Sequence, residues 1–292
     1  MADTAVKDGG SWRTSSEVHV KDGGTWRSSS TIHIKDGGTW REVFSSGSPG
    51  VFTVPSGVSG PGEIDFNSSV LNLTTPATQF NMTALGDFTN LRIRAWGGGG
   101  QQAPQYPSAA AGGFGGGYLS GSAGDVLTVA TNFGVVGPAP GGGAYGIFVN
   151  SKSQANARIV AGGGGATEND DGGRGQVAGA GGGTSGQPGT GYQSTSGGGP
   201  GYTSWPLQGG PGAGHGGGSG GGSGYWGGQG GPDICCLAAT GGGGGNTYIH
   251  PSVGTPQNQG GNRGTVGNPS DPVRGPAGNI QVPGRIYING PA

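Results

Sequence analysis

Half of the glycines in this chain lie in one stretch. Residues 161–245 contain 38 of the 76 glycines, in runs separated by short segments that carry aromatic residues. Such a stretch has few side chains to bury, although ordering each residue costs roughly 1–2 kcal/mol of backbone entropy and glycine loses the most freedom. Any structure here must therefore be stabilised mainly by backbone contacts, and the alternative is a disordered low-complexity segment.

Three features of this glycine-rich block favour an ordered structure. Serine is modest, aromatic residues are interleaved, and strand-like runs flank the block at 158–161 and 284–288. In the polyproline II conformation a glycine chain has three residues per turn, and helices without side chains can pack closely and exchange backbone hydrogen bonds. Weak Cα–H contacts to oxygen add to these bonds. Because the Gly-X-Y period of collagen is not kept, we expect packed polyglycine II helices instead.

The composition excludes several classes of protein. Only 10% of the residues are charged and the formal net charge is −1, so no basic surplus indicates binding to nucleic acid. No apolar run approaches the roughly 20 residues of a membrane-spanning helix. The first residues carry no positive and apolar signal region, so we expect synthesis in a cytoplasm without Sec export. Hydrophobic residues make up 30% of the chain, which predicts a small core outside the glycine-rich block.

A motif of Lys-Asp-Gly-Gly, then Ser or Thr, Trp and Arg occurs three times near the N-terminus. Its copies follow Val6, Val20 and Ile34, which are 14 residues apart. Asp-Gly-Gly between runs of alternating apolar and polar residues is typical of a tight hairpin turn. Residues 1–47 are therefore predicted to form a β-meander of three small hairpins.

Each of these hairpins is too small to bury its own tryptophan. Stacked repeats, identical chains or a partner protein would cover the rings. The tryptophans are therefore either core residues or anchors onto a larger assembly, and the two roles are compatible. We predict an attachment role for Trp12, Trp26 and Trp40.

The rest of the chain is predicted to be all-β, because no helical periodicity is present. Residues 48–62 are rich in Ser, Gly and Pro and are predicted to be a hinge, with a short strand inside it at 51–55. A β-sandwich-like part spans 63–161 and carries the glycine-rich block at 162–245, and 246–292 contain loops and a closing strand. Short alternating runs predict strands at 70–73, 80–83, 91–96, 126–130, 146–149, 157–160 and 285–288.

Three features together resemble the tail-fibre and adhesin proteins of tailed bacteriophages. They are the Lys-Asp-Gly-Gly-Thr-Trp-Arg repeat, the run Leu-Arg-Ile-Arg-Ala-Trp-Gly-Gly-Gly-Gly at 91–100, and Arg-Ile-Val-Ala-Gly-Gly-Gly-Gly at 158–165. The last two resemble glycine-rich fibre-tip domains. A similar pattern, closed by a strand like Gly-Arg-Ile at 284–286, occurs in the glycine-rich domain of anaplastic-lymphoma-kinase-type receptors. There a β-sandwich carries packed polyglycine helices, and the resemblance implies the same fold here.

Long glycine runs separated by aromatic loops are also similar to the distal tail-fibre adhesins of T-even-type phages. This resemblance implies a virion protein, made in the host cytoplasm, that attaches to the virion by its N-terminus and binds a host receptor through loops. The implied partners are the phage tail or baseplate, or another fibre protein, and a surface glycan or outer-membrane protein of the host. The N-terminal repeats do not resemble the docking segment of those adhesins, so direct attachment and attachment to another fibre both stay open. Because phage fibres are commonly trimers, we expect a homotrimer, with a monomeric tip as the alternative.

Aromatic residues in the loops are the candidates for receptor contact. Their rings stack on sugars or fill apolar crevices at a modest cost in entropy. For each ring the alternative role is packing on the glycine helices themselves. The predicted receptor-binding residues are Tyr106, Tyr192, Tyr202, Trp205, Tyr225 and Trp226.

No pattern in the chain predicts catalysis. Gly-Xaa-Gly-Xaa-Xaa-Gly arises by chance in so glycine-rich a sequence and has no weight as a nucleotide site. The four histidines lack the spacing of metal ligands, the acidic run at 168–171 lacks the alternating ligands of a calcium loop, and Cys235 and Cys236 are expected to be reduced. Nothing indicates the carboxylate pair of a glycosidase. We therefore expect no enzyme activity, cofactor or metal, and the alternative function is a structural virion fibre or decoration component without receptor binding.

Overall fold

The computed structural model divides the chain into two compact units, Met1–Ser48 and Pro49–Ala292. In the first unit it describes the backbone of six strands. In the second unit it describes residues 50–55, 63–66, 69–74, 78–102, 109–135, 140–167, 177–190, 195–199, 203–212, 219–231, 233–234, 238–262 and 264–290. No helix occurs among these residues, which confirms the all-β prediction.

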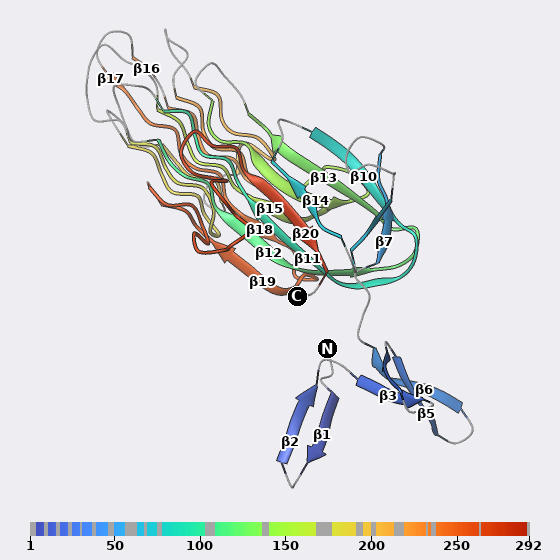
Figure 1. Cartoon of the computed structure of the whole chain (residues 1–292). Coiled ribbons are helices and arrows are strands. Elements are labelled where there is room, and N and C mark those ends of the chain that lie inside the picture. Colours follow the sequence, from blue (N-terminus) through green and yellow to red (C-terminus); the bar gives the residue numbers. More distant parts are fainter. Residues whose placement is uncertain are drawn as a thin grey trace. The chain divides into compact units, whose positions relative to one another are not determined.

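The first unit contains three two-stranded antiparallel hairpins (Figure 1). They are β1 Thr4–Asp8 with β2 Ser11–Ser15, β3 Val18–Asp22 with β4 Thr25–Ser29, and β5 Thr31–Asp36 with β6 Thr39–Ser45. In each hairpin the motif aspartate pairs with the residue three positions later, which leaves two glycines between the strands, as the turn motif predicts. Trp12, Trp26 and Trp40 occupy equivalent register positions, each opposite the lysine of its own repeat.

The three hairpins are separate sheets. No ladder joins one hairpin to the next among the described strands, so the hairpins are confirmed but the prediction of one continuous β-meander is wrong. The physical reason is that Asp-Gly-Gly closes a two-residue loop within each repeat, whereas the serine-rich connections between repeats carry no residue suited to such a turn. The side chains of the three tryptophans lie outside the described part of the chain, so their attachment role stays a prediction.

The second unit contains two antiparallel sheets that form a sandwich. The seven-stranded sheet has the order β18-β15-β14-β13-β10-β7-β8 and the five-stranded sheet the order β19-β12-β11-β20-β9. Their strands are β7 Val51–Thr53, β8 Glu63–Asp65, β9 Leu71–Leu73, β10 Thr78–Ala84, β11 Phe88–Trp96, β12 Phe114–Gly121, β13 Val126–Phe133, β14 Ala144–Val149, β15 Ala157–Ala161, β18 Tyr248–Ile249, β19 Gly254–Gln259 and β20 Arg285–Asn289. A further pair, β16 Asp233–Ile234 and β17 Ala238–Ala239, forms a separate short ladder.

Alternating side chains of both sheets form the main core. Ile93 on β11, Ile147 on β14 and Ile286 on β20 are fully buried in it. Every strand that alternation predicted is present, including β7 inside the predicted hinge. Phe52 on β7 is fully buried and packs edge-on against Phe66 and Phe88, with ring centroids 5.6 and 5.0 Å apart. The N-terminal part of the predicted hinge therefore belongs to the sandwich.

The outer face of the five-stranded sheet is covered by the segment between β19 and β20. Trp96 and Phe114 on the sheet form a second apolar cluster with Val266 and Ala277 from that segment. Beside this cluster, the Arg94 guanidinium lies 3.2 Å from a carboxylate oxygen of Asp271, and both side chains are almost wholly buried. The covering segment is thus attached to the sheet by apolar contacts and by a buried ion pair.

Two strands of the five-stranded sheet were missed by the sequence reasoning. β12 begins with Phe-Gly-Gly-Gly, a composition that weakens strands, yet it is paired on both sides by β11 and β19. At Gly115 an added Cβ would lie 2.9 Å from the Thr247 side chain, so glycine at this position allows Thr247 to approach the β12 backbone closely. β19 is fully exposed, polar and contains Pro256, which is tolerated because β19 is an edge strand.

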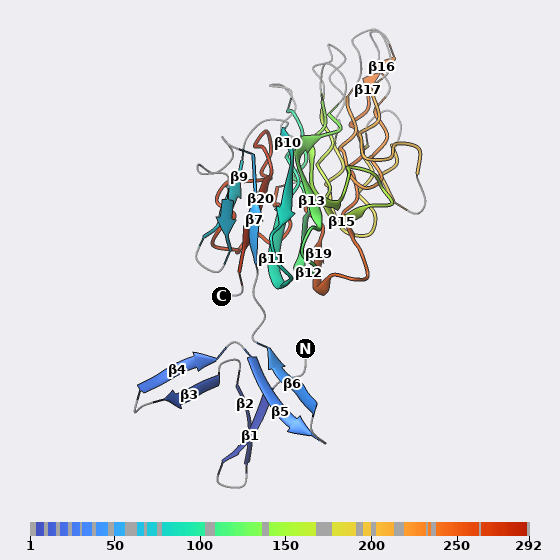
Figure 2. The same ribbon diagram turned by 90° about the vertical axis from the view of Figure 1, so that its right-hand side faces the viewer.

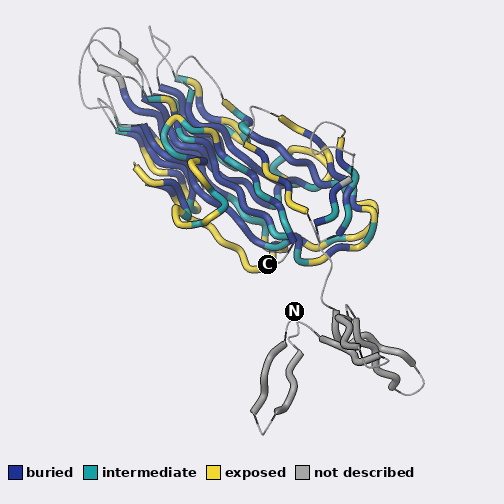
Figure 3. The backbone as a smooth tube through the Cα atoms, viewed as in Figure 1, coloured by how far each residue is buried: buried dark blue, intermediate teal, exposed yellow. Residues whose placement is uncertain are grey.

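Beyond the sheets the chain forms a bundle of extended glycine-rich segments (Figure 2). These segments are buried although most have almost no side chains (Figure 3). We call them the glycine lattice, which comprises residues 97–101, 109–113, 140–143, 162–167, 177–182, 186–190, 195–199, 209–212, 219–223, 227–231 and 240–246. The first three segments lie outside the block 162–245 that the sequence singled out, and they continue strands of the sandwich into the lattice.

Residues 162–167 hydrogen-bond to six neighbouring segments in a cycle of three residues. Their N–H groups donate from Gly163 and Ala166 to 219–223, from Gly164 and Thr167 to 97–101, and from Gly165 to 177–182. Their carbonyl oxygens accept from 109–113 at Gly162 and Gly165, from 240–246 at Gly163 and Ala166, and from 140–143 at Gly164. A three-residue cycle with six bonded neighbours is the packing expected of polyglycine II, so that prediction is confirmed.

Steric contacts explain why these positions are glycine. At Gly164 and Gly165 an added Cβ would stand 2.0 Å from the carbonyl oxygens of Ala110 and Gly242. Larger residues occur in the lattice only where their side chains have room. Ala110, Ala178 and Ala180 are such residues, and their methyl groups form a small buried cluster of their own.

Candidate functional site

The hydrogen-bond register defines the direction of the lattice segments. Gly97 donates to Gly113 and Gly100 to Ala110, so 97–101 and 109–113 run in opposite directions. Gly163 donates to Ser223 and accepts from Gly245, and equivalent bonds three residues on make 219–223 and 240–246 antiparallel to 162–167. The segments therefore alternate between leaving the sandwich and returning to it.

This alternation brings many connections to the same end of the lattice. We call that end, which lies away from the two sheets, the outer end (Figures 1 and 2). The chain leaves the lattice there after Gln101, Thr167, Thr190, Gly212 and Gly231, and it re-enters at Ala109, Pro140, Val177, Thr195, Ser219 and Thr240. The outer end thus gathers lattice residues, distant in sequence, at which many connections begin or end.

Three of the six predicted receptor-binding residues lie within the described part of the chain. Tyr106, Tyr192 and Tyr202 lie outside the described residues, but the neighbours of the first two along the chain are outer-end residues. Trp205, Tyr225 and Trp226 lie instead in connections at the opposite end, next to the sandwich. The three described residues therefore lie near the sandwich and not at the outer end, because successive connections alternate between the ends.

Two of the predicted residues, Tyr225 and Trp226, form a contiguous row with Tyr248 and His250. We call this row of four residues the aromatic strip. The ring of Tyr225 stacks on that of Tyr248, with centroids 4.0 Å apart and planes at 16°. Trp226 meets Tyr225 edge-on at 5.6 Å, and His250 meets Tyr248 edge-on at 6.5 Å. All four side chains are half-buried, so the strip combines packing with exposed ring surface.

The inner side of the aromatic strip packs on the seven-stranded sheet. Tyr225 and Tyr248 cover an apolar cluster that contains Phe133 and Phe148, on the face of the sheet opposite the main core. Tyr225 is tied to the sheet as well, because the Gln154 amide donates to its carbonyl oxygen over 2.5 Å. For Tyr225, packing on the fold is therefore an observed role, and receptor contact through its exposed part stays a prediction.

Trp205 and Trp226 belong to two connections that are bonded to each other. The N–H of Gly227 donates to the carbonyl oxygen of Trp205 over 2.7 Å, and Pro206 pairs with Trp226 in an isolated bridge. Asn246 adds a further tie, since its side-chain oxygen accepts the Trp226 N–H over 2.6 Å. These bonds fix the backbone that carries both indole rings.

The electrostatics of the aromatic strip favour neutral groups. Burial, with a smaller effect of Tyr248, raises the pKa of the Tyr225 hydroxyl. Burial, with a smaller effect of Arg158, lowers the pKa of His250. The Ser252 N–H donates to His250 Nδ1 over 3.1 Å, which leaves the proton of the neutral ring on Nε2. The strip thus offers planar faces with neutral polar edges, a surface suited to stacking against a flat or weakly polar ligand.

Two members of the aromatic strip, Tyr248 and His250, were missed by the sequence reasoning. They stand in the run Tyr-Ile-His at 248–250, two residues after the glycine run 241–245. Alternation on β18 was the available signal, because residues two apart on a strand share a face. It was overlooked because the search was confined to loops within the glycine-rich block.

Within the described residues, no three His, Cys, Asp or Glu side chains gather in a group that could bind a metal ion. The acidic run at 168–171, His215 and the two cysteines lie outside those residues. The described part of the chain also has no helix of the length and apolarity needed to cross a membrane.

Comparison with known proteins adds no relative. Neither the protein-family models nor the curated protein sequences contain a match to this chain. Functional reasoning therefore rests on the glycine lattice, its outer end and the aromatic strip.

Proposed function

We propose that this chain is a receptor-binding tail-fibre protein of a tailed bacteriophage. The observation that carries the proposal is the convergence of chain connections at the outer end of the glycine lattice. Because interior lattice bonds are made by backbone atoms, the connecting loops can change sequence without changing what supports them. An adhesin that must follow a changing host receptor needs this separation of stability from specificity.

In this proposal the two ends of the chain have different tasks. The N-terminal hairpins attach the protein to the tail, the baseplate or another fibre protein, with Trp12, Trp26 and Trp40 as anchors. Three identical hairpin units would bury more apolar surface than one, so we propose a homotrimer. The lattice carries the receptor-binding loops, and the receptor is a surface glycan or an outer-membrane protein of the host.

The two groups of aromatic residues make separate predictions within the proposal. Tyr106 and Tyr192, whose neighbours along the chain are at the outer end, would contact the receptor directly. Trp205 belongs to a connection near the sandwich, and Tyr225 and Trp226 belong to the next one. Tyr202 precedes Trp205 by three residues along the chain and is grouped with it here. If receptor contact is confined to the outer end, this second group contributes to packing alone.

The test is binding of the purified full-length protein to a panel of bacterial strains. We expect saturable binding to some strains and not to others. The double variant Tyr106→Ala with Tyr192→Ala should lose that binding at least about tenfold, while its circular dichroism and unfolding temperature stay unchanged. The matched double variant, Trp205→Ala with Trp226→Ala, reports whether the connections near the sandwich take part.

A folded protein that binds no strain would contradict receptor binding and favour the structural alternative, a fibre or decoration component. Saturable binding that survives both double variants would retain an adhesin but reject Tyr106, Tyr192, Trp205 and Trp226 as its contacts. In that case the N-terminal hairpins become the next segment to test.

A further inference from the structure

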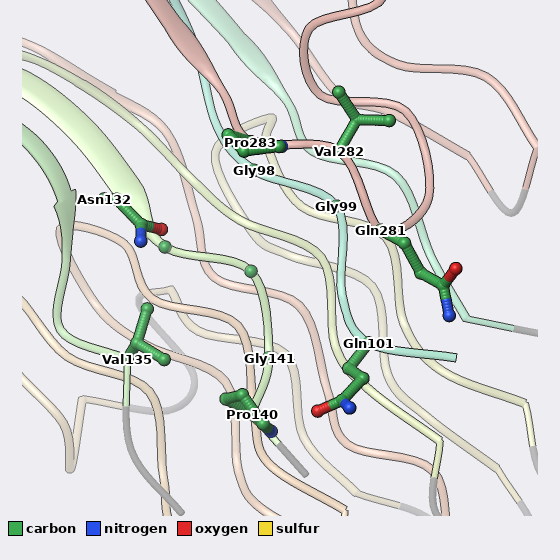
Figure 4. Close-up of a pocket in the computed structure, with 12 residues that line it drawn as sticks. Gly98, Gly99, Gln101, Asn132, Val135, Pro140, Gly141, Gln281, Val282 and Pro283 are labelled. Atoms are coloured by element: carbon green, nitrogen blue, oxygen red, sulfur yellow. The ribbon is translucent and has the colours of Figure 1, made fainter. Parts of the chain in front are cut away.

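One groove on the second unit is lined by lattice backbone. Its volume is about 390 Å³, within the range of ligand-binding clefts. Figure 4 shows Gly98 and Gly99 along its centre, Asn132 and Val135 on one side, and Gln281 and Val282 on the other. Pro140 and residues 141–143 complete the first side, so most of the lining lacks large side chains.

The groove coincides with an open position in the lattice. An interior segment has six bonded neighbours, whereas 97–101 bonds only to 109–113, 140–143, 162–167 and the segment that contains Gln281 and Val282. The groove lies between two of these neighbours, namely 140–143 and the segment of Gln281. Among the described residues no segment fills that position.

The carbonyl groups of 97–101 indicate which lattice atom a segment in the open position would hydrogen-bond. The oxygens of Gly98 and Gln101 accept from 162–167, and that of Gly100 accepts from Gln281. In the three-residue cycle, the Gly99 oxygen faces the one neighbouring position that no segment occupies. No donor among the described residues reaches this oxygen. Gly99 is also the one residue of 97–100 that is not buried. It therefore presents an acceptor toward the groove.

The groove walls contain two residues with unusual backbones. Gln281 has φ of 58° and Asn132 has φ of 46°, a left-handed region that costs energy for residues other than glycine. Such strain often accompanies binding sites. The Gln281 side chain donates from Nε2 to the Gln102 carbonyl oxygen over 2.9 Å, which orients its own oxygen as a free acceptor. The two walls thus add side-chain amides to the backbone acceptor on the floor.

We propose that this groove binds an extended, proline- and glycine-rich peptide in the polyproline II conformation, which completes the lattice as an added strand completes a sheet edge. A bound chain with three residues per turn would direct one N–H in three at Gly99. Glycine is required at that point because the neighbouring backbone is close, and proline is favoured elsewhere because it is already in the bound conformation. The proposal concerns a site separate from the receptor-contact residues and does not depend on them.

The probe is the acetylated, amidated nonapeptide (Gly-Pro-Pro)₃, measured with the full-length protein by isothermal titration and by amide exchange. We expect one peptide per groove and slower exchange at lattice residues next to it. A control peptide with every glycine replaced by sarcosine keeps only the N–H groups of its C-terminal amide and lacks every N–H donor along its backbone. It should bind at least about tenfold more weakly, because the bond to Gly99 is lost.

Two protein variants test the groove itself. Gln281→Gly removes the wall amide and relieves the left-handed backbone, so the protein should remain folded while peptide binding weakens several-fold. Asn150→Gly is the matched control, because Asn150 is also left-handed, with φ of 64°, but is absent from the groove lining. Val135→Trp, at an exposed position, should block the groove from the other wall.

Three outcomes would overturn the proposal. The first is that the peptide does not bind at millimolar concentration. The second is that the sarcosine peptide binds as tightly as (Gly-Pro-Pro)₃. The third is that Gln281→Gly and Val135→Trp both bind the peptide as tightly as the native protein does. Binding of neutral oligosaccharides in the same groove, without binding of the peptide, would assign the groove to carbohydrate instead and equally overturn it. Host-cell adsorption is measured separately, so failure here leaves the proposed function untouched.

Discussion

The sandwich and the glycine lattice are both buried, yet they are stabilised by different atoms. In the sandwich, Ile93 and Ile147 exclude water by packing side chains between two sheets, with a period of two residues. In the lattice, Gly164 is equally buried but contributes only its backbone, with a period of three residues. Burial by itself therefore does not indicate a hydrophobic core, and the two regions should respond differently to the same kind of substitution.

Polar side chains illustrate the same contrast. The sandwich interior tolerates few of them, whereas the lattice uses short polar side chains to complete its hydrogen bonds. Thr195 and Asn246 are both buried, and each bonds to backbone groups that no lattice segment satisfies. In the lattice, a hydroxyl or amide thus substitutes for a backbone group.

The largest expected effect is that of one methyl group inside the lattice. Gly164→Ala would place its Cβ 2.0 Å from the Ala110 carbonyl oxygen, which belongs to a segment bonded on other sides and is not free to move. Overpacking commonly costs 1–3 kcal/mol, and here we expect about 5 kcal/mol or more because the obstacle is backbone. Thermal unfolding and amide exchange of the lattice measure this loss.

The matched control for that variant is Gly86→Ala, in the turn between β10 and β11. An added Cβ at Gly86 meets no atom within 4 Å, so its effect should stay within about 0.5 kcal/mol. Equal unfolding temperatures for the two variants would show that the lattice is looser than the hydrogen bonds indicate.

The next largest effect concerns the buried ion pair between the five-stranded sheet and the segment that covers its outer face. Asp271→Ala would leave the Arg94 guanidinium, whose side chain is only 8% exposed, without its carboxylate partner. Removing one member of a buried ion pair typically costs about 3–5 kcal/mol. Denaturant unfolding should show this loss. Restoration of stability by also replacing Arg94 with methionine would confirm that the unpaired charge is the cause, whereas no restoration would assign the loss to packing of the covering segment.

Alkaline pH should separate the two regions. Burial raises the pKa of Tyr145 in the sandwich to about 12, from an ordinary value of 10. Because the folded state then retains a proton that the unfolded state loses, this stabilisation is complete below pH 10 and decreases as the pH rises from 10 to 12. A two-unit shift corresponds to about 3 kcal/mol. The lattice segments 162–167 and 240–246 contain no titratable side chain.

Unfolding as a function of pH, compared between the native protein and Tyr145→Phe, measures that dependence. In the variant, the free energy of unfolding should decrease much less between pH 10 and 12 than in the native protein. If the decrease persists unchanged, the titration belongs to another group and the sandwich has no special sensitivity to alkali.

The smallest expected effect is the loss of one polar side chain from the lattice. The Thr195 hydroxyl donates to the Gly241 carbonyl oxygen over 2.8 Å and accepts the Gly189 N–H over 3.1 Å. Thr195→Val retains the shape but leaves both groups unpaired, which typically costs about 1–3 kcal/mol. Faster amide exchange at Gly189 is the specific readout, and Thr195→Ser should retain slow exchange. Equal exchange rates at Gly189 in both variants would show that the Thr195 hydroxyl does not stabilise the lattice.

Much of the sandwich could be read from local sequence. Alternation at 91–96 and 285–288 identified the central strand of the five-stranded sheet, β11, and its neighbour β20, because residues two apart must face the same core. The glycine-rich strand β12 could not be found in this way, since it has almost no side chains to alternate. Its strand character comes from β11 and β19 on either side, which is a tertiary property.

The candidate site was predictable only in part. Aromatic residues between glycine runs were evident, but the position of Trp205, Tyr225 and Trp226 near the sandwich depends on the direction of each segment. The stacking of Tyr225 on Tyr248 joins positions 23 residues apart through lattice bonds that have no signature in either segment. The groove at Gly99 was invisible for the same reason, because it is defined by which neighbours a segment lacks.

The sequence by itself determined that the glycine-rich block needs backbone bonding, that a period of three was available to it, and that short strands on both sides would support it. Only the tertiary structure decided which glycine runs are neighbours, that segments 97–101, 109–113 and 140–143 join them, and which connections meet at the outer end. The physical reason is that glycine runs are locally alike. A run of Gly-Gly-Gly bonds equally well to any other, so its partner is selected by where the sandwich strands begin and end and by the lengths of the connections between them.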